Sequence, residues 1–471
     1  MSRSQDRTVF FTTPRASVEA SPLQRVCYTF FIAFLFMSFS RIFEVKFGSL
    51  HIPGLTYRVL ALMLVLSGAF LTAFRDRIGK YMMAFTALLM VSSVFSVWRG
   101  GSVQMLMNDW FLALVMFAAT ASLISDFPQF MQAARTMAFG TLVLTLIALK
   151  MGSMEATGRL TLPQGRFANP NELAQALLFS MPFWWAMYSL TRSLAMKVFA
   201  VGTLVLMLYV ISKTGSRGAL IATTVILTIM FIRASVTGKV KVLSGAVVLF
   251  AIAILIVPAR LRDRYLTLFS PDNTTANDAG FVDSAALSAD SRRQLLIESL
   301  FLTARHPLLG VGPDQFQVAE NDMARAEGRP KGAWLGTHNT FTQVSSECGI
   351  PAFLCFASMV ILSFRYSYSL YQKTKKRPEW KEIHMYAMAL NYSLIVFMVT
   401  GMFIHVAYTM FLPLFSGLAV SLRRTSAQVM GEEPTPHAVI AWPATGRPRQ
   451  RPAARVPAVR PLFHHEQQHI G

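Results

Sequence analysis

Apolar residues come in long blocks along this chain, separated by short polar stretches. Two of these blocks, 198–211 and 242–258, carry no charged residue at any position. A helix on the surface of a soluble protein keeps a polar face, whereas a membrane span needs about 20 mostly apolar residues. The pattern therefore predicts an all-α, polytopic membrane protein.

We expect about twelve transmembrane helices with one large outer loop. The predicted spans are 26–40, 55–74, 81–98, 104–124, 130–149, 172–190, 196–212, 219–235, 241–259, 349–370, 386–409 and 411–422. They divide the chain into a cytoplasmic segment (1–25), a first membrane part (26–259), the outer loop (260–348), a second membrane part (349–422) and a tail (423–471). The tail is rich in Pro and Arg, so we predict it to be disordered and cytoplasmic.

Composition and charge agree with this interpretation. Hydrophobic residues make up 53% of the chain and charged residues only 14%, against about 25% charged residues in a typical soluble domain. The formal net charge is +20, but many cations flank the spans, as the positive-inside rule expects, so nucleic acid is not the predicted partner. The rule places both termini inside, together with a cluster of cations before the last spans: Lys373, Lys375, Lys376, Arg377 and Lys381. It places 260–348 outside. Neither the three cysteines nor any carboxylates have metal-ligand spacing, so no metal or cofactor is predicted.

The first unusual outer segment is 165–172. Asn169, Pro170 and Glu172 follow the pattern of a helix start, with Asn169 as N-cap and Pro170 as the first helical residue. This structural role does not exclude a functional one for Arg166, since an arginine beside a helix N-terminus makes an anion site.

The second segment, 212–218, carries Lys213 and Arg217 where the positive-inside rule disfavours cations. Its glycines allow close approach of a ligand, and Arg217 can bind a phosphate with two hydrogen bonds. The alternative is that both cations only extend along the membrane edge toward water.

The third segment lies in the outer loop. Residues 290–305 form a predicted amphipathic helix, in which Leu296 and Leu300 share one row and Ile297 and Phe301 another. Arg292 and Arg293 lie one turn earlier. Such a helix could simply pack on the bundle or lie at the membrane interface. A turn at 310–313 follows it.

The fourth segment begins with His338-Asn339, and Gly349 follows after nine intervening residues. A single loop histidine is most often only solvated. Histidine is nevertheless the commonest acid–base group, which makes His338 a catalytic candidate.

In this order the four segments resemble the O-antigen ligase and polymerase family of bacterial membrane glycosyltransferases. The resemblance rests on 166–171, 216–218, the arginine helix with 306–312, and His338-Asn339 through Glu347 and Gly349. One position departs from the ligase pattern, because Ala352 stands where ligases tend to carry Gly, Thr or Tyr.

The resemblance implies a GT-C-like layout in the bacterial inner membrane, with a periplasmic active site. It implies transfer of a glycan from an undecaprenyl-diphosphate-type carrier, without a nucleotide sugar or metal. The acceptor would be lipid A-core, another lipid-linked repeat or a protein hydroxyl. Arg217 and His338 are then the expected catalytic residues, with His338 as general base or phosphate ligand and His405 as a weaker candidate. The expected substrate-binding residues are Arg166, Lys213, Arg292, Arg293, Asn339 and Glu347.

Two rival functions remain open at this point. Charged residues inside the membrane mark transport paths, but the middles of the predicted spans carry almost none, which disfavours a transporter. A non-catalytic membrane scaffold would leave the outer Arg and His residues without a role.

Overall fold

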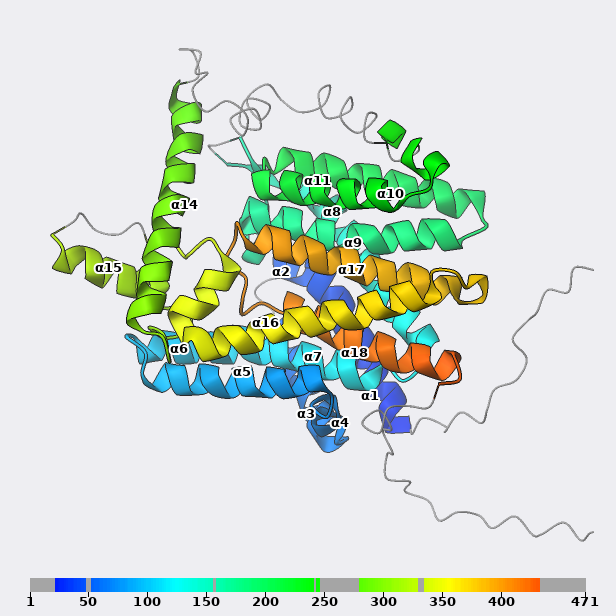
Figure 1. The fold of residues 1–471 in the computed structure, drawn as a ribbon, viewed down its shortest axis with the longest axis horizontal. Helices are drawn as coiled ribbons and strands as arrows, with labels where there is room; N and C mark the ends of the chain where they lie inside the picture. The colour runs from blue at the N-terminus through cyan, green and yellow to red at the C-terminus, as the bar shows by residue number, and fades with distance from the viewer. Residues whose placement is uncertain are drawn as a thin grey trace, which may run out of the picture. The chain divides into compact units, whose positions relative to one another are not determined.

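The computed structural model describes residues 22–47, 52–155, 158–240, 243–245, 279–328 and 334–432. The described elements are almost all helical (Figure 1), apart from one short antiparallel pair of strands, β1 (Ser153–Met154) and β2 (Leu160–Thr161). The helices are α1 (Pro22–Ser40), α2 (Ile42–Phe47), α3 (Ile52–Leu66), α4 (Ala69–Ala73), α5 (Arg77–Val94), α6 (Arg99–Met105), η2 (Leu106–Trp110), α7 (Phe111–Leu123), α8 (Phe127–Met151), η3 (Arg166–Ala168), α9 (Pro170–Leu190), α10 (Leu194–Lys213), α11 (Arg217–Arg233), α14 (Ala279–Arg305), α15 (Phe316–Ala326), α16 (Thr340–Thr374), η4 (Pro378–Trp380), α17 (Lys381–Gly401) and α18 (Phe411–Val429).

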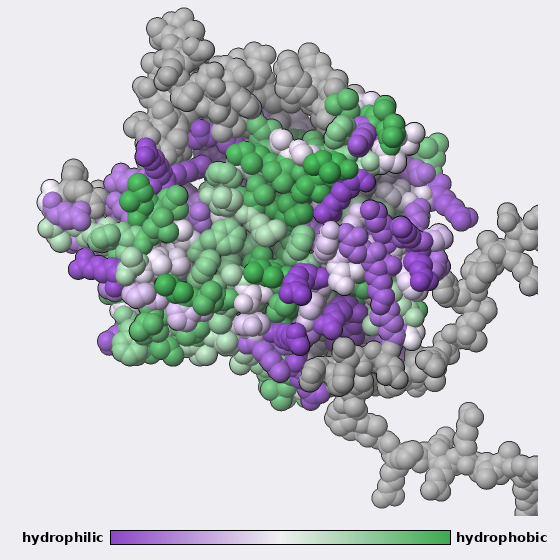
Figure 2. All heavy atoms as spheres, viewed as in Figure 1, coloured by the Kyte–Doolittle hydropathy of each residue, from purple (hydrophilic) through white to green (hydrophobic). Residues whose placement is uncertain are grey.

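Six helices of the described part are long and apolar enough to cross a membrane. These candidate spans are Leu23–Ser40, Arg99–Leu123, Phe127–Met151, Leu194–Lys213, Thr340–Thr374 and Pro378–Gly401. Figure 2 shows apolar side chains over the middle of the bundle. The prediction of an all-α polytopic membrane protein is therefore confirmed, while the count of twelve spans stays a prediction.

Short polar side chains start several of these helices, because each one accepts a backbone N–H that the first turn leaves unpaired. Asn169 accepts from Asn171 N at 2.9 Å with Pro170 as the next residue, so the predicted start of α9 is confirmed. Ser216 caps α11 by accepting from Ala219 N. Asn339 caps α16 by accepting from two backbone N–H groups, those of Phe341 and Thr342.

Several helix boundaries differ from the predicted ones. α14 begins at Ala279 and α16 at Thr340, both earlier than expected, and α18 runs on to Val429. α17 ends at Gly401, so the prediction that one span extends through 409 is wrong. Most of the predicted span 241–259 and of segments 1–25 and 423–471, and all of loop residues 260–278 and 329–333, lie outside the described residues.

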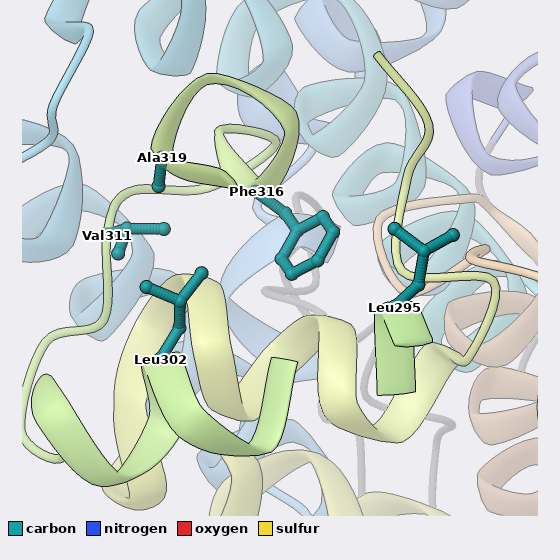
Figure 3. Close-up of a cluster of buried hydrophobic side chains, with 5 residues drawn as sticks. All are labelled: Leu295, Leu302, Val311, Phe316 and Ala319. Atoms are coloured by element: carbon teal, nitrogen blue, oxygen red, sulfur yellow. The ribbon is translucent and has the colours of Figure 1, made fainter. Parts of the chain in front are cut away.

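α14 lies across the direction of α16 and packs on it (Figure 1). Its Leu295 and Leu302 are buried with Val311 and with Phe316 and Ala319 of α15 (Figure 3). The two apolar rows noted in the sequence are not on the buried face of this helix. Their residues are all exposed: Leu296, Ile297, Leu300 and Phe301. Apolar residues occupy neighbouring rows of this helix, so periodicity alone does not select the buried one.

Candidate functional site

The segments singled out in the sequence meet at one end of the bundle, around the N-terminus of α16. The exposed cations between α16 and α17 lie at the other end of these helices. Three features build the site: a kink in α16, a turn seated on that kink, and an irregular segment between α17 and α18.

The kink in α16 is at Gly349, whose φ of +83° is not helical. A Cβ atom at this position would lie 2.3 Å from the carbonyl oxygen of Leu308, which no side chain tolerates. The next residue, Ile350, donates its N–H to the carbonyl of Pro307 at 2.7 Å. The motif glycine is thus required because a second stretch of backbone crosses α16 at this point.

That second stretch is the turn 306–313. Val311 N donates to the carbonyl of Ser346 at 3.0 Å, and Gly312 N donates to that of Glu347 at 2.8 Å. Gly310 also has a positive φ, and a Cβ there would lie 2.2 Å from the backbone of Glu347. The glycines of this turn therefore allow it to lie directly against α16.

Glu347 locks the turn and the α17–α18 connection to α16. Its side chain is only 2% exposed. One oxygen accepts Asp314 N–H at 2.8 Å and the hydroxyl of Tyr408 at 2.7 Å, and the other accepts Phe316 N–H at 3.4 Å. A carboxylate engaged by three protein donors holds the site together, and the predicted substrate contact of Glu347 stays a prediction.

His338 occupies a strained position directly before the N-cap of α16. Its φ is +49°, a left-handed conformation that only a few per cent of non-glycine residues adopt. Its ring lies against the ring of His405, with the centroids 5.2 Å apart and the planes at 74°. Within the described part of the chain, its buried Nδ1 has no hydrogen-bond partner. Strain and an unused polar atom in one side chain are typical of functional positions.

The electrostatic surroundings keep His338 neutral. Burial, followed by the charges of His405 and Arg292, lowers the pKa of His338 from 6.5 to about 4. Arg292, on α14, is thus one of the charges that disfavour a proton on His338, while its predicted contact with substrate stays a prediction. Its neighbour Arg293 is exposed.

The first two segments are tied together by Arg159. Its Nε donates to the carbonyl of Thr214 and its Nη2 donates to Asn171 Oδ1, both at 2.8 Å. One guanidinium thus joins the start of α9 to the loop before α11. The site residues predicted from the sequence do not include Arg159. Its signal was a cation in an outer segment, where the positive-inside rule disfavours one.

Arg217 is the first residue of α11, directly after the N-cap Ser216, and is partly buried. Lys213 ends α10 and lies over the ring of Tyr209 at 5.5 Å, which fits the edge-of-membrane alternative. Arg166 opens the short helix η3 near the same end. Asn339 acts as an N-cap, which gives it a structural role beside its predicted substrate contact.

Residues 402–410 connect these parts. The sequence predicted most of them to lie in a span, so His405 was the one candidate site residue named among them. Phe403 packs on Gly218, next to Arg217, where an added Cβ would lie 3.2 Å from it. Farther along the segment, His405 contacts His338 and Tyr408 binds Glu347. One irregular segment thus contacts the surroundings of Arg217, His338 and Glu347.

The fold and this arrangement define a polytopic α-helical membrane protein with a polar site at one end of its bundle. Residues 202–357 match the family model Wzy_C, described as O-antigen ligase. The match confirms the resemblance to the O-antigen ligase and polymerase family, supports a membrane glycosyltransferase of that type, and does not favour a transporter. No curated protein matches the chain.

Proposed function

We propose that this protein transfers a glycan from an undecaprenyl-diphosphate-type carrier to an acceptor hydroxyl. The observation that carries the proposal is His338, a residue of the matched region with a left-handed backbone and a buried Nδ1 that has no hydrogen-bond partner in the described part of the chain. The match leaves out Arg166 and the weaker candidate His405 and includes the other predicted site residues: Lys213, Arg217, Arg292, Arg293, His338, Asn339 and Glu347.

The reaction makes two demands that these residues meet. The acceptor oxygen attacks the anomeric carbon of the donor sugar, and the bond from that carbon to the phosphate oxygen breaks. The electron pair leaves with the lipid diphosphate, whose growing negative charge Arg217 and Arg292 stabilise. The proton of the acceptor hydroxyl passes to His338, which acts as general base. The neutral His338 could alternatively donate a hydrogen bond to the leaving phosphate.

The protonation state of His338 supports the role of base. A histidine with a pKa of about 4 is neutral at pH 7 and can accept a proton. The positive charge of Arg292 weakens the basicity of His338. A bound diphosphate offsets that positive charge and raises the pKa of His338, so donor binding itself prepares the base.

This mechanism predicts the pH dependence of transfer. For the free enzyme, kcat/KM should not fall as the pH drops through 6.5, where an ordinary histidine becomes protonated. It should fall only as the pH approaches 4, because protonation removes the base. An acid limb centred near 6.5 in kcat/KM would contradict the proposed role of His338.

We place the reaction on the periplasmic side of the bacterial inner membrane. The exposed cluster of Lys373, Lys375, Lys376 and Arg377 lies at the end of α16 opposite to His338. Cations gather on the cytoplasmic side of membrane proteins, so the site end faces out.

The acceptor decides between ligase and polymerase. The test is transfer by the purified full-length protein in liposomes, with a lipid-diphosphate-linked oligosaccharide as donor and either lipid A-core or no added acceptor. Product on lipid A-core identifies a ligase, and longer lipid-linked chains without added acceptor identify a polymerase. Arg217→Ala should lose transfer at unchanged membrane abundance. A lack of product with every donor and acceptor from the native host, including protein acceptors, would contradict the proposal.

A further inference from the structure

The second histidine of the site is contributed by the segment 402–410. The ring of His405 meets that of His338 edge to face, at 5.2 Å between centroids. On another side it lies on the backbone of Gly336, where an added Cβ would be 2.8 Å from its Nε2. His405 is thus enclosed between two residues of the stretch that leads into α16.

Three side chains on one face of α16 hold this segment in place. Thr340 Oγ1 donates to the carbonyl of Ile404 at 2.7 Å and accepts Val406 N–H at 3.2 Å. Gln343 accepts Ala407 N–H at 3.1 Å, and Glu347 accepts the Tyr408 hydroxyl at 2.7 Å. Positions 340, 343 and 347 lie on one side of a helix. The helix that begins just after His338 therefore also fixes the segment that carries His405.

The charges around His338 come from two packed elements. His405 on the connecting segment and Arg292 on α14 both disfavour a proton on His338. Glu347, the buried carboxylate of α16, is occupied by Tyr408 and by the backbone of 314–316. Two imidazoles this close cannot both be charged without strong repulsion, so they titrate as a pair.

We propose that His405 is a positioning residue that acts through His338, as the second member of a histidine pair in which a proton on one ring opposes a proton on the other. It supports the His338 ring and keeps that ring ready to receive the acceptor proton. The catalytic part of this inference rests on the proposed function. The electrostatic coupling of the two histidines does not, because it can be measured without any substrate.

The first test needs no turnover. Deuterium exchange at the imidazole C2 position, followed by mass spectrometry of the full-length protein in detergent, reports the titration of each histidine. His338 should titrate near pH 4 in the wild type. In His405→Asn and His405→Phe its midpoint should rise, on the order of half a pH unit or more, because a like charge is removed. The titration midpoint of His338 in both variants should stay below pH 6.5, because burial and the charge of Arg292 still lower it.

His384→Phe is the matched control, because His384 packs against an aromatic ring of α16 at the opposite end of the bundle. It should leave the titration of His338 unchanged. An identical midpoint for His338 in the wild type and in both His405 variants would overturn the pairing.

The second test is the transfer assay across pH. His405→Asn should lower kcat about tenfold or more with little change in the KM for the lipid-linked donor, and should shift the acid limb upward by the amount seen in exchange. His405→Phe should recover part of kcat, because it restores the ring contact, but should keep the shifted limb. If the His405 variants lower kcat but leave the acid limb of the pH profile in place, His405 has only a structural role and the inference is overturned.

The two proposals fail in different ways. Wild-type kinetics in the His405 variants, together with loss of transfer in His338→Ala, would overturn only the role of His405. Absence of transfer in the wild type would overturn the proposed function, while the exchange experiment would still decide whether the two histidines form a pair.

Discussion

The α16–α17 hairpin has a proposed outer end, with His338, and a proposed inner end, with the exposed cations. Each end holds a histidine against an aromatic ring, but the backbone around the two histidines differs. At the inner end His384 stacks on Tyr371 at 4.7 Å and its Nδ1 lies 3.2 Å from Thr374 Oγ1. All three residues lie within regular helices. At the outer end His338 has a left-handed backbone and His405 lies in a segment between helices. Irregular or strained backbone is concentrated at functional sites. The comparison therefore assigns His384 to a packing contact and His338 to the candidate site.

The largest effect should come from the kink that only the outer end has. Gly349→Ala places a Cβ 2.3 Å from the backbone of Leu308 at a positive φ, and neither backbone can move without disrupting the turn. We expect a loss of about 3 kcal/mol or more of stability, seen as lower thermal stability in detergent and lower membrane abundance. Gly202→Ala in α10 is the control, because an added Cβ there meets nothing within 4 Å. Equal melting temperatures for the two variants would contradict the structural role assigned to the kink at Gly349.

Glu347 should come next. Glu347→Ala removes the carboxylate acceptor of the buried Asp314 N–H and leaves the Tyr408 hydroxyl with only the Cys348 sulfur, 3.2 Å away, which costs about 2–3 kcal/mol of stability. Glu347→Gln retains an acceptor oxygen and should lose less. A carboxylate at the inner end, Glu379, pairs with Arg377 at 3.6 Å while largely exposed, and its removal should cost under about 0.5 kcal/mol. Thermal unfolding of the three variants tests this order, and equal losses at Glu347 and Glu379 would refute it.

The smallest effect should be that of Arg159→Lys. A lysine ammonium cannot reach both the Thr214 carbonyl and Asn171 in the geometry of the guanidinium, so one of two 2.8 Å hydrogen bonds is lost. We expect about 1 kcal/mol of destabilisation and a donor KM raised a few-fold, because the loop before Arg217 loosens. Arg192→Lys, at an exposed position of the inner end, should change neither quantity. An unchanged KM in Arg159→Lys would mean that this tie does not shape the donor site.

The sequence was sufficient to predict those helices whose position depends on residues close together in the chain. Blocks of apolar residues located most of the described membrane helices, and the capping preference of Asn169 located the start of α9. It failed at 402–410 because this stretch contains as many apolar residues as a span. What ends the helix at Gly401 is a set of partners on α16, at Thr340, Gln343 and Glu347, which no local pattern reveals.

In the candidate site, too, local patterns could be predicted from the sequence and long-range contacts could not. Its residue types could be chosen from charges and glycines in outer segments, as for Arg217, Arg292 and His338. Their roles depend on distant contacts: Glu347 proves to be enclosed by protein donors, and His405 is brought to His338 by a different part of the chain. The face by which α14 packs was also undetermined, since several of its rows are apolar.

The most direct test of the central claim is to compare glycan transfer by His338→Ala and His384→Ala in liposomes of the same composition. The account predicts that His338→Ala lowers kcat by about a hundredfold or more at wild-type membrane abundance, whereas His384→Ala retains transfer within a few-fold of wild type. Comparable transfer by the two variants would contradict the assignment of the site to the outer end of the bundle.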